Sequence, residues 1–356
     1  MAITVWVRIT ATLWGFVLLG LCVVPASAQT PQTASAGDWP VPRTEWGHPD
    51  LQGNWTNQWR TPTERRIGYG PTLTGAQVDS NEHAIESRID EGHAASDPDR
   101  EPPAAGGNVG GYNEVYYDRG DGAARVHGEP RSSLITFPED GRIPALSLSG
   151  AQRLAAFHDL RLSFGEADHP EVLTQADRCL VSYGSTLGPP MLPSGGYNSN
   201  YTIVQNEDHV LILTEMIHDV RIVSLREPAE VPRSEIRPWF GVSWGHWEDD
   251  TLVVETRRIN PKQMLSPTFD PSFTSSVVLS DDVRVEERFT RTDEHTLLYE
   301  FEVEDPATYT EPWGGQIPMR RFDDLLYEYA CHEGNYAIEG ILSGARYQEG
   351  LDGERR

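Results

Sequence analysis

Alternating apolar and polar residues dominate the chain from about Tyr197 onward. Side chains along a strand point alternately to its two faces, so this alternation predicts strands with one buried face. Short acidic turns separate these strands, which favours antiparallel neighbours. Such turns occur at Glu207–Asp208, Glu248–Asp250, Thr292–Glu294 and Glu304–Pro306. The pattern predicts a mainly β protein, an antiparallel barrel or sandwich.

The first half of the chain carries weaker signals. A helix is predicted around Gly75–Arg88, and another after Ser149, an N-cap candidate with Gln152 three residues later. Between them, Ser133–Phe137 predicts a strand. The long polar loop at residues 97–122 is typical of a lid or of a disordered segment. We expect one or two short helices beside the β structure.

Alternation also identifies side chains that share a face of a strand. Glu287 shares its face with Phe289, and Tyr299 and Phe301 lie on the apolar face of residues 296–304. Apolar faces point into a barrel, so these side chains are expected inside it. Glu287 is then either kept protonated by burial or paired with an arginine. Candidate partners are Arg221, Arg178 and Arg257.

Two histidines are placed by the same argument. His246 shares a face with Trp244, and His218 shares one with Val220. We expect both imidazoles to point, with Glu287, into one interior. A packed or hydrogen-bonded structural histidine explains the same pattern without any chemistry.

The N-terminus resembles a Sec-type signal peptide, since Arg8 precedes an apolar run that ends in Ala26–Ala28. Cleavage is expected before Gln29, which predicts a periplasmic or extracellular protein. The predicted division is a signal peptide at 1–28, a flexible leader at 29–48, a single domain at 49–348 and a tail at 349–356.

The chain is acidic, with 29 basic and 54 acidic residues and a formal charge of −25. Such a charge disfavours nucleic acid as a partner, and we expect no membrane insertion after signal cleavage. Lys262 is the only lysine, so Schiff-base chemistry would depend on it. After cleavage only Cys179 and Cys331 remain, and two cysteines in an oxidising compartment are expected to form a disulfide.

Several sequence blocks carry a resemblance. Gly53–Trp55 is similar to the Gly-x-Trp signature of lipocalin-like calycin barrels, which enclose a small lipophilic ligand. Blocks such as LQGNWTN, EMIHD, GHWEDDTLVVET and YEYACHEGNY look like a large family of exported, mostly uncharacterised bacterial proteins. The resemblance implies a secreted single-domain β protein and no particular reaction.

Glu215, His218 and Asp219 form the densest polar cluster within the apolar strands. A tight turn at Ile217 would let them converge, and an imidazole near carboxylates can act as a general acid or base. His246, which lies between two tryptophans, is a second acid/base candidate. A satisfied polar cluster at a strand end remains the structural alternative.

The stretch YACHEGNY places His332 and Glu333 directly after Cys331. Alternation allows only one of the two side chains to enter the interior without a bulge. His332 is therefore predicted to transfer protons, and Glu333 to orient or cap. The side chains predicted to bind substrate are Trp244, Tyr299, Phe301, Glu287, Arg221 and Asn200.

Cofactor signals are missing from the sequence. No Gly-rich nucleotide fingerprint and no His-Glu-x-x-His motif occurs, so we expect no organic cofactor. Metal binding is an alternative, since Glu215, His218, His246 and His332 could meet in the tertiary structure and form a site.

The first functional hypothesis is an exported, cofactor-independent acid/base enzyme, of isomerase, lyase, hydratase or cyclase type. Its substrate would be a small apolar or aromatic molecule. The alternatives are a non-catalytic carrier of a lipophilic ligand and a metal-dependent hydrolase or oxygenase.

Overall fold

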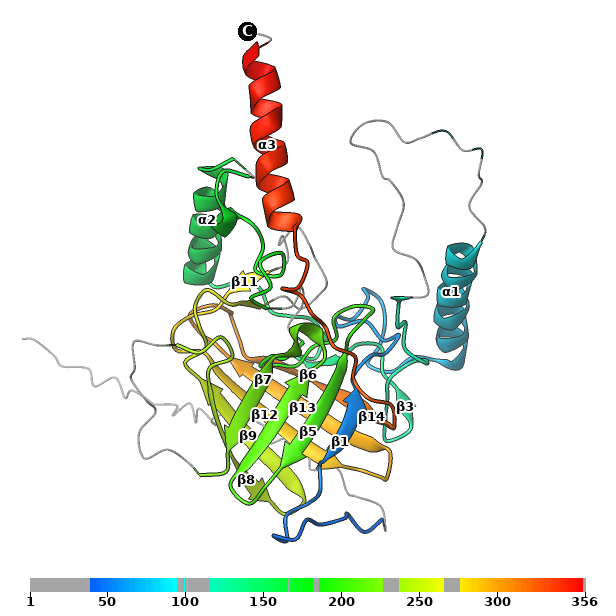
Figure 1. Ribbon diagram of the computed structural model, residues 1–356. Coiled ribbons are helices and arrows are strands. Elements are labelled where there is room, and N and C mark those ends of the chain that lie inside the picture. Colours follow the sequence, from blue (N-terminus) through cyan, green and yellow to red (C-terminus); the bar gives the residue numbers. More distant parts are fainter. Residues whose placement is uncertain are drawn as a thin grey trace, which may run out of the picture. The chain divides into compact units, whose positions relative to one another are not determined.

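The computed structural model describes residues 39–94, 99, 101, 116–165, 167–181, 186–226, 237–265 and 276–354 (Figure 1). The predicted signal peptide, the first part of the predicted leader and most of the predicted loop at 97–122 lie outside these residues.

Nine strands close into a barrel in the order β1-β5-β6-β7-β8-β9-β12-β13-β14, with β14 paired back to β1 (Figure 1). The short β4 adds to β14. The strands are β1 Gly53–Thr56, β4 Ile135–Phe137, β5 Asn200–Gln205, β6 His209–Thr214, β7 Val220–Ser224, β8 Val242–Glu248, β9 Thr251–Arg257, β12 Arg284–Arg291, β13 Thr296–Glu304 and β14 Trp313–Phe322. The predicted mainly β, lipocalin-like barrel is confirmed. It is mixed and not purely antiparallel, because the chain returns to the same end of the barrel between β7 and β8, which run parallel.

The described chain has three α-helices, where one or two were expected: α1 Gly75–His93, α2 Leu148–Leu162 and α3 Ala337–Glu354. Thr74 and Gln77 form a capping box at α1, and the N-cap of α2 is Ser147 instead of the predicted Ser149. Helix α3 was not predicted, because glycines interrupt its sequence and lower its helix propensity. No described helix is both long and apolar enough to cross a membrane.

Smaller elements complete the described structure. They are the single-turn helices η2 Pro170–Val172 and η3 Met216–His218 and the short strands β2 Arg125–Val126, β3 Glu129–Pro130, β10 Met264–Leu265 and β11 Val277–Val278.

The barrel end that holds the β12–β13 turn is closed by the chain before β1. The Arg291 guanidinium lies 5.0 Å from the Trp39 ring and 5.3 Å from the Trp55 ring, and it donates to the Asp50 carbonyl at 3.0 Å. Residues 39–48, predicted as the end of a flexible leader, therefore contribute packing and hydrogen bonds to the fold.

Side chains fill the barrel interior. The rings of Phe289, Tyr299, Phe301 and Trp313 follow one another at centroid distances of 5.1, 5.7 and 5.7 Å. Residues before β5, such as Met191, join this core from the other end. The interior is a packed core, as in small barrels whose side chains meet at the axis.

Candidate functional site

A charged pair lies at the centre of this core. The carboxylate of Glu287 receives two hydrogen bonds from the Arg221 guanidinium, at 2.6 and 2.9 Å, and both residues are buried. The Tyr299 hydroxyl donates to Glu287 at 2.8 Å and accepts from the backbone N–H of Met191 at 2.8 Å. Burial lowers the pKa of Arg221, but the Glu287 carboxylate outweighs this effect, so the pKa of Arg221 is raised and its guanidinium stays charged. Of the three candidate arginines, Arg221 is the partner of Glu287.

Tyr299 and Phe301 point inward as expected, but they are core residues in contact with other side chains. Burial raises the pKa of Tyr299 far above its ordinary value, so its phenol stays protonated. These side chains hold the barrel together and line none of the cavities described below.

The expectation that His246 and Trp244 face the interior is wrong, although Trp244 is buried, at 8% exposed, on the outer face of β8. Ser243, Gly245 and Trp247 occupy the inward positions of β8, and the His246 side chain is 64% exposed and bonded to Glu248 at 3.2 Å. A Cβ at Gly245 would lie 2.8 Å from the Val253 carbonyl oxygen, so this inward position has no room for a larger side chain. Alternation correctly predicted that Trp244 and His246 lie on the same face of β8, but it did not predict that this face turns outward.

His218 also points outward. Ile217 and His218 adopt positive φ values of 62° and 48°, so the tight turn on which the convergence depended is present. Val220 and Ile222, which share the face of His218, are 42% and 58% exposed. The turn directs His218 to the surface, where its Nδ1 lies 2.8 Å from the Tyr329 carbonyl oxygen.

Four of the predicted side chains lie on η3, at its two ends, or on the C-terminal segment that contacts it, outside the barrel. We call Glu215, His218, Asp219 and His332 the η3 cluster. Burial raises the pKa of Asp219 to about 6, and the charges of His218 and His332 oppose the rise.

Glu215 holds the C-terminal segment against the η3 cluster, of which it is a member. Its buried carboxylate accepts from the Asn200 side chain at 2.6 Å and from the backbone N–H of Tyr327 at 3.1 Å. Asn200 thus has a structural partner where substrate binding was predicted. Glu333 is exposed.

The predicted disulfide is present and joins Cys179 to Cys331. Asn335, four residues later, donates to the Asp177 carbonyl at 3.3 Å. The bridge therefore ties the segment after η2 to the C-terminal segment that carries His332.

Asp219 is expected to make stability depend on pH. Its folded pKa, about 6, exceeds the value of about 4 of an unfolded aspartate, so the folded state binds more protons between these values. The free energy of unfolding should therefore fall as pH rises from about 4 to above 6, by about 1 to 2 kcal/mol after allowance for screening at this partly exposed site. Urea titrations of the wild type and of Asp219→Asn at several pH values measure this, and the variant should lack the fall. Parallel profiles for the two proteins would contradict the assignment, and Glu333→Gln serves as the exposed control.

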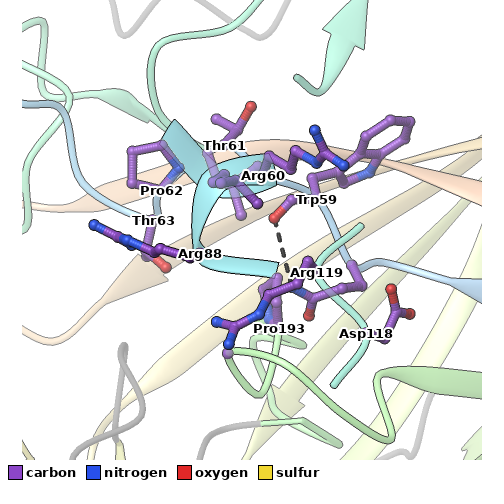
Figure 2. Close-up of a pocket in the computed structure, with 13 residues that line it drawn as sticks. Trp59, Arg60, Thr61, Pro62, Thr63, Arg88, Asp118, Arg119 and Pro193 are labelled. Atoms are coloured by element: carbon purple, nitrogen blue, oxygen red, sulfur yellow. Dashed lines mark hydrogen bonds between the residues drawn. The ribbon is translucent and has the colours of Figure 1, made fainter. Parts of the chain in front are cut away.

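Two of the cavities in the described part of the chain are each lined by three or more basic side chains. The first, the β1-loop pocket, has a volume of about 290 Å³ and lies against the Gln58–Thr63 segment that follows β1 (Figure 2). Arg60, Arg88 and Arg119 line it, with Asp118 as the acidic residue.

The second cavity, the α2 pocket, is larger, at about 460 Å³. Its walls are mainly apolar and come from α2, the segment around η2, and the chain near Trp239, Met264 and Val278. Its charged lining residues are Arg153, Arg161, Arg178, Lys262 and Glu171. This size and lining are typical of sites that bind small organic molecules.

Two cations of the α2 pocket are available to a ligand. Within the described part of the chain, neither Arg178 nor Lys262 has a side-chain hydrogen bond or an ion pair. The backbone of Lys262 is held, since its N–H donates to Asn260 at 3.0 Å and its carbonyl accepts from Gln175. Arg153 instead donates to the Ala307 carbonyl at 3.2 Å and to Thr308.

Sequence reasoning missed this pocket because its residues come from separate segments. Arg178 was considered as a partner for Glu287 and Lys262 for a Schiff base, but nothing linked them to Phe157 or Trp239. The presence of a single lysine was the one sequence signal. Among the described residues, no three His, Cys, Asp or Glu side chains are arranged to hold a metal ion.

Comparisons with protein-family models, with curated proteins and with solved structures find no match for this chain. Functional inference therefore depends on the two pockets and the η3 cluster.

Proposed function

We propose that the protein binds a small organic anion with an apolar body in the α2 pocket, as a binding or carrier protein. The observation that carries the proposal is an apolar cavity of about 460 Å³ whose lining holds Arg178 and Lys262, two cations without a side-chain partner among the described residues. The ligand is the small lipophilic or aromatic molecule expected from the sequence, with its site outside the barrel.

The apolar walls favour a hydrocarbon or aromatic body. Phe157, Val172 and Met264 are buried or half-buried around the cavity, and the Arg161 guanidinium lies 5.9 Å from the Phe157 ring. Burial of apolar ligand surface against such walls contributes roughly 25 cal/mol per Å².

The charges favour an anionic head group. The pocket gathers four basic side chains and one acidic one on a chain that carries 54 acidic residues. A guanidinium and an ammonium both bind carboxylates, the guanidinium with a bidentate geometry. An aryl or alkyl carboxylate has both the apolar body and the anionic head group that the pocket favours.

Binding of 2-naphthoate, with the neutral 2-naphthamide as its isosteric control, tests the proposal by calorimetry. We expect saturable binding of the anion, at least tenfold tighter than that of the amide. The Arg178→Gln/Lys262→Gln variant should lose this preference, while Arg125→Gln, an exposed arginine of β2, should retain it. Equal affinity of the wild type for both probes, or no binding, would refute the proposal.

Acid/base catalysis at the η3 cluster is the second candidate, favoured by the raised pKa of Asp219 beside His218 and His332. Ring opening of 5-nitrobenzisoxazole, which begins when a base removes a carbon-bound proton, is a suitable probe. A rate that rises with a midpoint near pH 6 and is lost in Asp219→Asn supports this role. Equal rates for the wild type and the variant would exclude it.

A further inference from the structure

The β1-loop pocket brings together three arginines from separate parts of the chain. Arg60 follows β1, Arg88 lies on α1, and Arg119 precedes the β2–β3 hairpin. In Figure 2 the Arg88 and Arg119 side chains extend to the same side of the pocket. The lining also contains Thr61 and Thr63, so it is more polar than the α2 pocket.

The acidic residue of the pocket has a backbone partner. Asp118 accepts a hydrogen bond from the backbone N–H of Gly120 at 2.8 Å. In Figure 2 its carboxylate and the Arg119 guanidinium extend in opposite directions. Three basic side chains and one acidic side chain leave a formal charge of +2 in the lining.

Arg60 and Arg88 differ in their partners. The Nε of Arg60 donates to the Gly120 carbonyl at 2.9 Å, and its Nη1 lies 3.8 Å from Glu86, so this side chain is held in place. In the described ranges the Arg88 side chain makes no hydrogen bond or ion pair and is exposed. Arg88 can therefore turn its guanidinium toward a ligand at little cost.

One wall of the pocket is fixed and aromatic. The Trp59 indole donates to the Pro318 carbonyl at 2.5 Å, and the Arg320 guanidinium lies 5.1 Å from its ring. Pro62, Ile85 and Leu134 add apolar surface. The cavity therefore offers both a cationic side and surface for an organic body.

We propose that the β1-loop pocket is a second binding site, which takes the phosphate group of a small phosphate monoester. A phosphate monoester carries nearly two negative charges at neutral pH, and the lining holds three basic side chains against one acidic side chain. Guanidinium groups bind phosphate oxygens with paired hydrogen bonds, and Arg88 and Arg119 supply them on one side. The inference is independent of the α2 pocket, because the two cavities share no lining residue.

Calorimetric titration of the oxidised protein with phenyl phosphate tests this site. We expect saturable binding that weakens as salt is raised. Arg88→Gln should weaken it several-fold and Arg88→Gln/Arg119→Gln at least tenfold. Phenyl phosphate is itself an aromatic anion, so the titrations are made in the Arg178→Gln/Lys262→Gln background, which lacks the cations proposed to bind such anions in the α2 pocket. Arg125→Gln, an exposed arginine of β2, is the control in that background and should leave the affinity unchanged.

Three results would overturn the proposal. They are no saturable binding in the Arg178→Gln/Lys262→Gln background, unchanged affinity when Arg88→Gln is added to it, or an equal loss of affinity in the Arg125→Gln control. Arg88 is exposed, so the single variant Arg88→Gln is expected to fold. If the double variant is unstable, the affinity of the single variant still tests the proposal.

Discussion

Replacement of Glu287 by glutamine is expected to lower the free energy of unfolding by about 3 to 5 kcal/mol. The substitution keeps the shape of the side chain but leaves the Arg221 guanidinium buried without a counter-charge. Arg221 has no access to water, since it is 3% exposed and lies inside the barrel. Urea unfolding followed by tryptophan fluorescence gives the magnitude.

A paired replacement separates the charge effect from packing. In Arg221→Met/Glu287→Leu no buried charge remains, so most of the stability lost in Glu287→Gln should return. The surface pair Arg288–Glu248, at 2.6 Å, is the matched control, and Arg288→Gln should change stability by less than about 1 kcal/mol. A loss below about 1 kcal/mol in Glu287→Gln would show that the charge of this carboxylate does not stabilise the core.

Removal of the disulfide by Cys179→Ser/Cys331→Ser is expected to have a comparable effect. The bridge joins residues 152 positions apart, and closure of so long a loop contributes about 5 kcal/mol in the chain-entropy model. The variant should also bind 2-naphthoate more weakly, because Arg178 of the α2 pocket is adjacent to Cys179. Urea unfolding and calorimetry of the same sample measure both effects.

Asn335→Ala provides the local control. Its side chain donates two long hydrogen bonds, to the Asp177 carbonyl at 3.3 Å and to the Cys179 Sγ at 3.2 Å, and accepts one from the backbone N–H of Ala337 at 3.1 Å. We expect the free energy of unfolding to fall by about 1 kcal/mol, well below the effect of losing the disulfide. If the serine variant unfolds at the same urea concentration as the wild type, the C-terminal segment does not stabilise the barrel through the disulfide.

The η3 cluster shows which part of the candidate site could be predicted from the sequence. Glu215, His218 and Asp219 are close in sequence, and the turn at Ile217 was visible in the pattern, so their association could be predicted. His332 joined them through the disulfide. The exposure of His218 could not be predicted, because it depends on the two positive φ values at the turn.

The sequence by itself determined the strands, a mainly β class, the Cys179–Cys331 pairing and the burial of Glu287. These follow from short-range alternation and from residue counts, which do not depend on distant contacts. The tertiary structure decided which face of β8 turns inward, that side chains fill the barrel, and where cavities remain. Those outcomes depend on volumes and contacts between residues far apart in the chain, as at Gly245 against Val253 or in the α2 pocket.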